Sequence, residues 1–315
     1  MVKSILRSAT QVVSVGSVDG VLTAAAVLRQ IGNPSVGLTF TQAFTVEKVP
    51  VETWPTGQRV VFVDLAVDNR DPNKTRRFIA RLKAGGHTLI AIVDEHSRED
   101  WLSVLGTFDG LTVEPRTRSD VYGSSGALLL AALSDEADEH TRMLCAAADA
   151  GDKMQFIGIG ELANKAMKAN IPDDARRVHL ARHFATSAEP DAQILAWVKE
   201  YDGIEAAHKE VHAAKQDLLQ GIHRVVTTGK RIDVTTLMRE LYEAGAVVVV
   251  MEAELYDKAV GKKVRQIAFG TNSQKLDLLA CLKAAGVGAS GFAQKANVPP
   301  AEEEAALAAV RALLS

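Results

Sequence analysis

Cysteine is scarce in this sequence. Only Cys145 and Cys281 occur among 315 residues, far apart and each within apolar, helix-like sequence. Two such thiols support neither a disulfide framework nor a thiolate metal site. Because unpaired thiols are typical of reducing compartments, we expect the protein to be cytoplasmic.

Long apolar runs are also missing. No run approaches the roughly 18 residues that a membrane span requires. The N-terminal residues Met1–Ser4 are not followed by the apolar segment of a signal peptide. We therefore expect no membrane association.

The sequence has no large excess of charge of either sign. Its formal net charge is −3, so the molecule as a whole does not attract nucleic acid through its field. Hydrophobic residues make up 47% and charged residues 24%, which is usual for a globular protein with a sizeable core. A length of 315 residues favours two domains over one.

The most informative stretch runs from Val60 to His96. Val60–Asp64 and Thr88–His96 are rich in β-branched residues and do not alternate, as in strands buried on both faces of a parallel sheet. A helical pattern between them stops at a Gly-Gly pair. Ligands bind at the carboxyl ends of such strands, so we expect Asp64 and Asp94-Glu95-His96 to lie side by side there. The alternative is that these are polar residues entering loops.

Alternating strands and helices continue this pattern along the first half of the chain. The predicted strands cover residues 11–15, 36–40, 60–64, 88–93 and 111–113, and the predicted helices 21–30, 73–84, 101–105, 127–133 and 141–148. Such alternation predicts an α/β fold with a doubly wound parallel sheet.

A second, smaller α/β unit is predicted after a long helix. Apolar residues from Pro190 to Val225 lie close to one helical stripe, and turn, strand and helix patterns resume past Gly229. We therefore divide the chain into a first domain at 1–185, a connecting helix at 186–228 and a second domain at 229–315.

Two phosphate-binding motifs fail on inspection. Thr228-Gly229-Lys230 has Arg224 where a P-loop needs glycine, and no Ser or Thr follows the lysine. The stretch from Gly158 to Ala163 fits a relaxed dinucleotide fingerprint, but Asp173 comes too early for the ribose-binding acid.

Two histidine pairs have a spacing that can chelate a metal. His179 with His183, and His208 with His212, are separated by four residues in helical sequence. Neither pair has a third acid or thiolate close by in the sequence. Surface histidines are therefore the simpler interpretation.

Acidic residues recur after apolar elements at Asp19, Asp64, Asp94-Glu95-His96 and Asp152. Their order and spacing resemble the DHH phosphoesterase superfamily, which includes single-strand exonucleases, nanoRNA and cyclic-dinucleotide phosphodiesterases and family II pyrophosphatases. The resemblance covers most of the chain and implies a DHH domain followed by a DHHA-type domain.

Four motifs carry this resemblance. Ser14–Gly20 corresponds to the first motif, Thr-His-x-Asp-x-Asp-Gly, and Asp64 to the aspartate of the second. Asp94-Glu95-His96 corresponds to the Asp-His-His motif. The fourth motif is an aspartate followed four residues later by phenylalanine, which fits Asp152 better than Asp149.

The metal motifs are degenerate. Members of the superfamily usually hold two divalent ions, and Val15 and Ser17 replace the His and Asp that would hold one of them. The resemblance implies one remaining ion, with four ligands: Asp19, Asp64, Glu95 and Asp152. An all-carboxylate set favours Mg²⁺ or Mn²⁺ over Zn²⁺.

The resemblance also implies roles in catalysis and substrate binding. Asp64 and His96 are the implied catalytic residues, with His96 contacting the phosphate. Substrate contacts are expected from Ser14 and Ser17 and from the C-terminal loop at Gly288, Ser290 and Gly291, where the DHHA-type domain has a Gly-Gly-His clamp. Phe292 stands in place of the clamp histidine.

Two functions remain open at this point. The first is a divergent phosphoesterase that uses Mn²⁺ or Mg²⁺ to hydrolyse a phosphodiester or phosphoanhydride in a nucleotide or short oligonucleotide. The second is a catalytically lapsed protein that binds a nucleotide, a nucleic-acid strand or a protein partner. The sequence leaves the substrate and the oligomeric state open.

Overall fold

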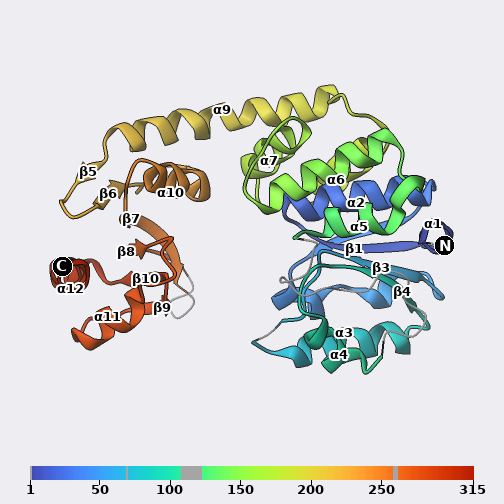
Figure 1. Ribbon diagram of the computed structural model, residues 1–315, viewed down its shortest axis with the longest axis horizontal. Helices are drawn as coiled ribbons and strands as arrows, with labels where there is room; N and C mark the ends of the chain where they lie inside the picture. The colour runs from blue at the N-terminus through green and yellow to red at the C-terminus, as the bar shows by residue number, and fades with distance from the viewer. Residues whose placement is uncertain (1, 69, 108–122, 258–261) are drawn as a thin grey trace. The chain divides into compact units, whose positions relative to one another are not determined.

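The computed structural model describes residues 2–68, 70–107, 123–257 and 262–315 (Figure 1). The chain forms two compact units, Met1–Glu200 and Tyr201–Ser315. Their boundary lies within helix α9 (Ala192–Ala213). The strand predicted at residues 111–113 lies outside the described residues.

The first unit is built on a four-stranded parallel sheet. The strand order is β2 (Gly37–Thr41), β1 (Gln11–Val15), β3 (Arg59–Val63) and β4 (Thr88–Val93). The predicted α/β class with a parallel sheet is confirmed.

Both faces of this sheet are covered by helices, which explains why its strands do not alternate. Val61 and Val63 pack with α2 (Val18–Ile31), α5 (Ser125–Leu133) and α6 (Glu139–Asp152). The neighbouring Val60 and Phe62 point to the opposite core, with α3 (Pro72–Ala84) and α4 (Arg98–Leu105). Figure 1 shows these helix layers on the two sides of the sheet.

Further elements complete the first unit: α1 (Val2–Arg7), η1 (Ala43–Lys48), η2 (Val51–Thr53), η3 (Ser134–Glu136), α7 (Ile159–Ala169) and α8 (Asp174–Thr186). The stretch from Gly158 to Ala163 enters helix α7, and the element before it is helix α6 rather than a strand. This arrangement lacks the strand that a dinucleotide fingerprint follows.

The second unit has a six-stranded sheet in the order β5-β6-β7-β8-β10-β9. Its strands are β5 (Gln216–Asp217), β6 (Ile222–Val226), β7 (Val248–Asp257), β8 (Lys262–Gly270), β9 (Ser290–Phe292) and β10 (Lys295–Val298). Its other helices are α10 (Val234–Glu243), α11 (Leu278–Ala284), η4 (Pro300–Glu302) and α12 (Glu303–Leu314). Within this second sheet, only the β6–β7 pair is parallel among the strand pairs of the described residues.

The long connecting helix is shorter than predicted. Helix α9 ends at Ala213, and the residues up to Val226 form the hairpin of β5 and β6. Leu219, Gln220 and Gly221 have positive φ angles of 75°, 53° and 73°, which no helix accommodates. None of the helices in the described ranges combines the length and the apolar character of a membrane span.

Candidate active site

Strands β3 and β4 bring a group of acidic residues together. They run parallel with Val63 opposite Val93, so Asp64 and Asp94 follow the two strands at the same edge of the sheet. Ligand atoms of Asp64, Asp94, Glu95 and His96 all lie within 4.8 Å of one another. We call these four residues the acidic cluster.

Asp64 occupies an unusual backbone position in this cluster. Its φ is +52°, in the left-handed region, while its N–H donates to Val93 O at 2.8 Å. The side chain is buried, and its Oδ2 accepts a hydrogen bond from Ser17 Oγ at 3.1 Å. Non-glycine residues in this region concentrate at functional sites. The backbone therefore turns the Asp64 carboxylate toward the loop after β1.

The loop after β1 requires a glycine at position 20. Ser17 begins α2 by accepting a hydrogen bond from the Gly20 N–H at 3.2 Å. A Cβ at Gly20 would lie 2.3 Å from Val15 O and 3.0 Å from Asp64 Oδ2. Only glycine allows the first turn of α2 to approach the acidic cluster this closely.

Glu95 is held by the start of helix α5. Ser125 Oγ donates to Glu95 Oε2 at 2.6 Å and lies 3.4 Å from Asp64 Oδ1. Both Ser125 and Glu95 are buried. The hydroxyl of Ser125 therefore fixes two carboxylates from neighbouring strands.

Asp94 orients the histidine of the cluster. Its Oδ1 accepts a hydrogen bond from His96 Nδ1 at 2.6 Å, and its Oδ2 accepts one from Trp101 Nε1 at 2.7 Å. Asp94 is fully buried, whereas the His96 side chain is 30% exposed. The imidazole is thus anchored on its buried side and reaches toward solvent.

The acidic cluster is electrostatically strained. Burial, followed by the nearby charges of Asp19, Glu95 and Asp94, raises the pKa of Asp64 well above its ordinary value. Burial and Asp94 also raise the pKa of Glu95, against the lowering effects of His96 and Ser125. Ionised carboxylates held this way are stabilised by a cation.

The donor atoms of the cluster fit a hard divalent ion. Carboxylate oxygens from Asp64, Asp94 and Glu95 are the ligands that Mg²⁺ and Mn²⁺ prefer, and His96 adds one nitrogen. Val15 packs against the apolar core around Phe62. It therefore contributes packing where the first motif would contribute a metal ligand.

The remaining predicted ligands lie around the cluster. Asp19 is close enough to Asp64 to raise its pKa. Asp152 is the last residue of helix α6. It does not belong to the acidic cluster, whose ligand atoms all lie within 4.8 Å of one another. Asp149 accepts from Ser124 Oγ at 2.8 Å and pairs with Lys153 at 2.5 Å.

Ser14, one of the expected substrate contacts, lies near the end of β1. Ser14 is fully buried, and its hydroxyl donates to Gly20 O at 2.9 Å. Its role is to hold the turn into α2. Ser17, in contrast, is half-buried and contacts Asp64 directly.

The predicted clamp residues lie in the second unit. Gly288 N–H donates to Glu302 Oε2 at 2.6 Å, and Ser290 and Gly291 belong to strand β9. Gly288, Ser290 and Gly291 are all exposed. Gly291 has a φ of +136°, and a Cβ there would lie 2.2 Å from Lys295 O, so this position accepts only glycine.

A cavity of about 560 Å³ opens beside the loop after β1. Its lining includes Gly16, Thr41, Thr45, Lys48 and Arg177. Arg177 Nε donates to Gly16 O at 2.8 Å, which places a guanidinium at this loop. Asp174 also lines the cavity and pairs with Arg177 at 3.0 Å. The cavity is large enough for part of a nucleotide, and Lys48 suits a phosphate.

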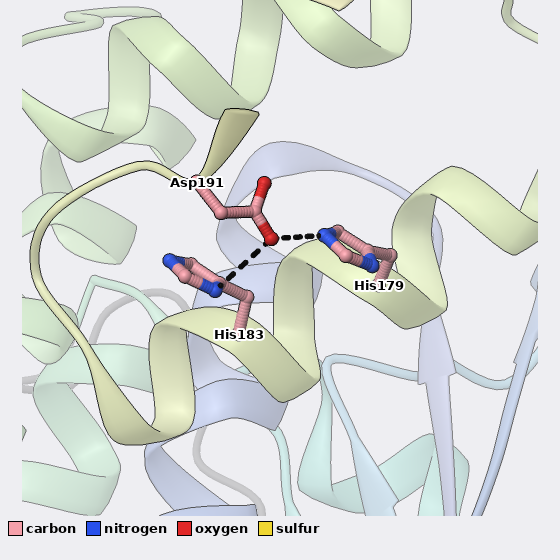
Figure 2. A group of neighbouring side chains, drawn as sticks. All are labelled: His179, His183 and Asp191. Carbon is pink, nitrogen blue, oxygen red and sulfur yellow. Dashed lines mark hydrogen bonds and ion pairs between the residues drawn. The ribbon is translucent and has the colours of Figure 1, made fainter. Parts of the chain in front are cut away.

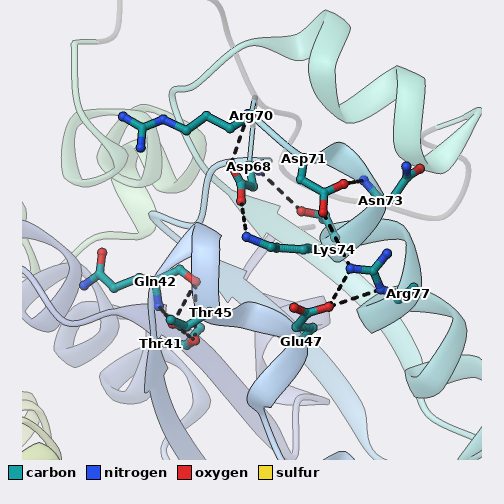
Figure 3. A network of polar contacts seen from close by, with 11 residues as sticks. Thr41, Gln42, Thr45, Glu47, Asp68, Arg70, Asp71, Asn73, Lys74 and Arg77 are labelled. Carbon is teal, nitrogen blue, oxygen red and sulfur yellow. Dashed lines mark hydrogen bonds and ion pairs between the residues drawn. The ribbon is translucent and has the colours of Figure 1, made fainter. Parts of the chain in front are cut away.

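Figure 3 shows the polar contacts next to this cavity. Gln42 N–H donates to Thr45 Oγ1 at 3.2 Å, and two ion pairs join Arg77 to Glu47 at 2.6 Å and Lys74 to Asp68 at 3.2 Å. Lys48 takes part in no ion pair with the residues that the structure describes. Its charge is therefore available to a ligand.

The fold of this chain is similar to the folds of several solved structures. The pGpG-specific phosphodiesterase PggH from Vibrio cholerae aligns with a TM-score of 0.63 at 10% identity, over 96% of this chain and 98% of that one. RecJ from Thermus thermophilus, solved with Mn²⁺, gives 0.56 at 14% identity, over 99% of this chain and 54% of that one.

CDC45 from Entamoeba histolytica gives a TM-score of 0.52 at 10% identity, over 99% of this chain and 97% of that one. The chain has the DHH fold. No protein-family model and no curated protein matches the sequence itself.

Two residues of this site, Ser125 and Trp101, carry no site signal in the sequence. Trp101 belongs to the predicted helix at 101–105, and Ser125 comes just before the predicted helix at 127–133. A serine at a helix start is a common capping signal, and nothing local distinguishes it from one that holds Glu95. Tertiary packing alone brings these two side chains to Asp94 and Glu95.

Proposed function

We propose that this protein hydrolyses a phosphodiester or phosphoanhydride in a nucleotide or short oligonucleotide, with one Mn²⁺ or Mg²⁺ ion. The observation that carries the proposal is the acidic cluster, in which buried carboxylates converge and burial and like charges raise the pKa of Asp64. The likeness to PggH and to manganese-bound RecJ supports it at the level of the fold.

Asp64, Asp94 and Glu95 are the residues proposed to hold the ion, with Asp19 beside them. A bound divalent ion supplies activation of water and neutralisation of phosphoryl charge. Asp152 remains a proposed ligand that would have to approach from the end of α6.

His96 is proposed to contact the substrate phosphate. Asp94 fixes the ring through Nδ1, and the side chain is 30% exposed. A positioned donor of this kind stabilises the charge that develops on phosphoryl oxygens, with an effect of about 3 kcal/mol. Ser17, which donates to Asp64, keeps that carboxylate oriented.

The cavity beside Gly16 is the proposed binding place for the nucleotide. Lys48 and Arg177 supply positive charge, and Thr41 and Thr45 supply hydroxyl groups. We propose that a clamp on the substrate is formed by Gly288, Ser290 and Gly291. These residues belong to the second domain, for which we propose the bounds 229–315, after a first domain at 1–185 and a connection at 186–228. Backbone N–H groups of glycine-rich loops suit a phosphate contact.

Hydrolysis assays with Mn²⁺ test the proposal. The substrates are pGpG, a cyclic dinucleotide, a short oligonucleotide and pyrophosphate. We expect activity on at least one of them, its loss in Asp64→Asn, and a decrease of roughly 100-fold in His96→Ala. Asp100→Asn changes an exposed carboxylate on α4 and serves as the control. Native activity that survives in Asp64→Asn would place the chemistry elsewhere.

One observation favours a binding protein without hydrolysis. Val15 packs against the apolar core and has no donor atom, and Ser17 donates to Asp64, so neither provides a ligand for a second ion. The double variant Val15→His with Ser17→Asp separates the two functions. Activity that is absent from the native protein and appears in the double variant would identify a lapsed enzyme.

A further inference from the structure

A second group of side chains that could hold a metal ion is separate from the acidic cluster. His179 and His183 are on α8, and the structure brings Asp191, the residue before α9, between them (Figure 2). His179 Nε2 lies 2.8 Å from Asp191 Oδ2, and His183 Nδ1 lies 3.4 Å from the same oxygen. Asp191 is therefore a third candidate ligand, which the spacing of the two histidines does not indicate. It lies in the segment between α8 and α9.

The hydrogen bond on the far side of His183 decides its tautomer. His183 Nε2 lies 2.6 Å from the carbonyl oxygen of Glu189, which can only accept, so Nε2 carries the proton. In the neutral ring, Nδ1 then presents a lone pair to Asp191 Oδ2. Two acceptors face each other at this distance only when a proton or a metal cation lies between them. A backbone carbonyl that orients a histidine this way is characteristic of metal ligands.

Asp191 is positioned in the same manner. Its Oδ1 accepts a hydrogen bond from Ile194 N–H at 2.8 Å, which caps α9 and leaves Oδ2 directed at the two histidines. Asp191 Oδ2 therefore faces both imidazole rings.

The spacing of the three donor atoms suits a tetrahedral ion. Ligands bound to zinc at ~2.0–2.2 Å stand roughly 3.4 Å apart. The three donor atoms all lie within 4.8 Å of one another, and the two rings are stacked with an interplanar angle of 5°. The side chains are 37%, 19% and 34% exposed, so an ion can enter from solvent.

We propose that His179, His183 and Asp191 form a Zn²⁺ site that joins α8 to the start of α9. His183 Nδ1, His179 Nε2 and Asp191 Oδ2 are the ligands, and water completes the fourth position. The ion takes the place of the Nε2 proton in the neutral ring of His179, and that proton moves to Nδ1 of the same ring. Imidazole nitrogens with one carboxylate select zinc over the hard ions that suit the acidic cluster.

Zinc titration calorimetry on the full chain tests this proposal, after chelator treatment and in excess Mg²⁺, which occupies the carboxylates of the acidic cluster. We expect one Zn²⁺ per chain. His183→Gln and Asp191→Asn should each weaken binding at least about tenfold, since loss of even an outer partner of a ligand costs roughly 10–100-fold. Asparagine still caps α9, so Asp191→Asn tests the charge separately from the fold.

His212→Gln is the matched control. His208 and His212 have the same spacing and His208 contacts Glu240 at 2.7 Å, but among the described residues the three do not bring their ligand atoms together as a group. Cobalt gives a second measurement. The Trp197 ring lies 5.2 Å from that of His179, so Co²⁺ should quench its fluorescence in the native protein and lose that effect in His183→Gln. Absence of zinc binding, or equal affinity in the native protein, His183→Gln and Asp191→Asn, would overturn the proposal and leave a His183–Asp191 ion pair.

Discussion

Trp101 Nε1 donates a 2.7 Å hydrogen bond to Asp94 Oδ2, and both residues are fully buried. The other oxygen of Asp94 holds His96, so the indole ring is connected through one carboxylate to the exposed imidazole. The same indole packs 5.8 Å from Phe62 under strand β3. Trp101 therefore serves both the hydrophobic core and the acidic cluster.

Replacing Trp101 by phenylalanine separates these two contributions. Trp101→Phe keeps an aromatic ring against Phe62 but leaves Asp94 without its N–H donor. We expect the free energy of unfolding to decrease by about 1–3 kcal/mol, measured by urea denaturation. Trp54→Phe, at a half-buried ring beside His87, is the control. Equal losses in the two variants would show that the hydrogen bond contributes nothing.

The raised pKa of Asp64 predicts how stability depends on pH when no divalent ion is present. A carboxyl group whose pKa is raised by folding contributes stability below its unfolded pKa of ~3.9, and this is lost as pH rises through the folded pKa. Asp64→Asn removes the ionisable group. We therefore expect the variant to be about 1–3 kcal/mol more stable than the native protein near pH 8, with the difference shrinking toward pH 4.

Adding Mn²⁺ should make the native protein more stable than Asp64→Asn. The ion binds the folded native protein and stabilises it, whereas Asp64→Asn has lost a ligand. Denaturation curves with Mn²⁺ and with chelator, at pH 5 and pH 8, provide the measurement. A native protein that stays more stable than Asp64→Asn at pH 8 in chelator would contradict the proposed strain.

The acidic cluster should bind a single ion. We would measure this by manganese titration calorimetry in a His183→Gln background, so that the site at His179, His183 and Asp191 does not add to the measured stoichiometry. We expect a stoichiometry of one, because Val15 is packed in the core and Ser17 is bonded to Asp64. The Val15→His, Ser17→Asp variant should bind two ions. Binding of two Mn²⁺ ions by the protein that keeps Val15 and Ser17 would refute the loss of the second metal site.

Gly20 should be irreplaceable, in contrast to a helical glycine elsewhere. A Cβ at Gly20 meets Val15 O at 2.3 Å, whereas one at Gly203 in α9 meets no atom within 4 Å. We expect Gly20→Ala to destabilise the protein by ~1–3 kcal/mol and to weaken manganese binding. Gly203→Ala should gain up to about 1 kcal/mol. Similar thermal midpoints for the two variants would contradict this account.

The first sheet could be predicted because its strands are buried on both faces. Runs such as Val60–Val63 contain only apolar residues, and the helices between them have clear stops, so element type and order follow from local sequence. Strand β6 could not be predicted this way. Ile222 and Val225 continue the helical stripe of α9 by coincidence, and their burial in the second sheet depends on pairing with Val248 and Met251.

The site was predictable where it depends on strand ends. Asp64 and Asp94 follow neighbouring strands, so topology alone places them together. Asp191 was not predictable as a partner of His179, because their contact depends on the path of residues 187–191 after α8. A helical spacing identifies two ligands on one helix, but it does not identify the third ligand from another segment.

The left-handed backbone of Asp64 determines which substitutions can be interpreted. Asparagine tolerates a φ of +52° nearly as well as aspartate. Alanine in the left-handed region adds about 1–2 kcal/mol of backbone strain that has no connection with the carboxylate. An alanine scan of this cluster would therefore overstate the importance of position 64 relative to its neighbours Asp94 and Glu95.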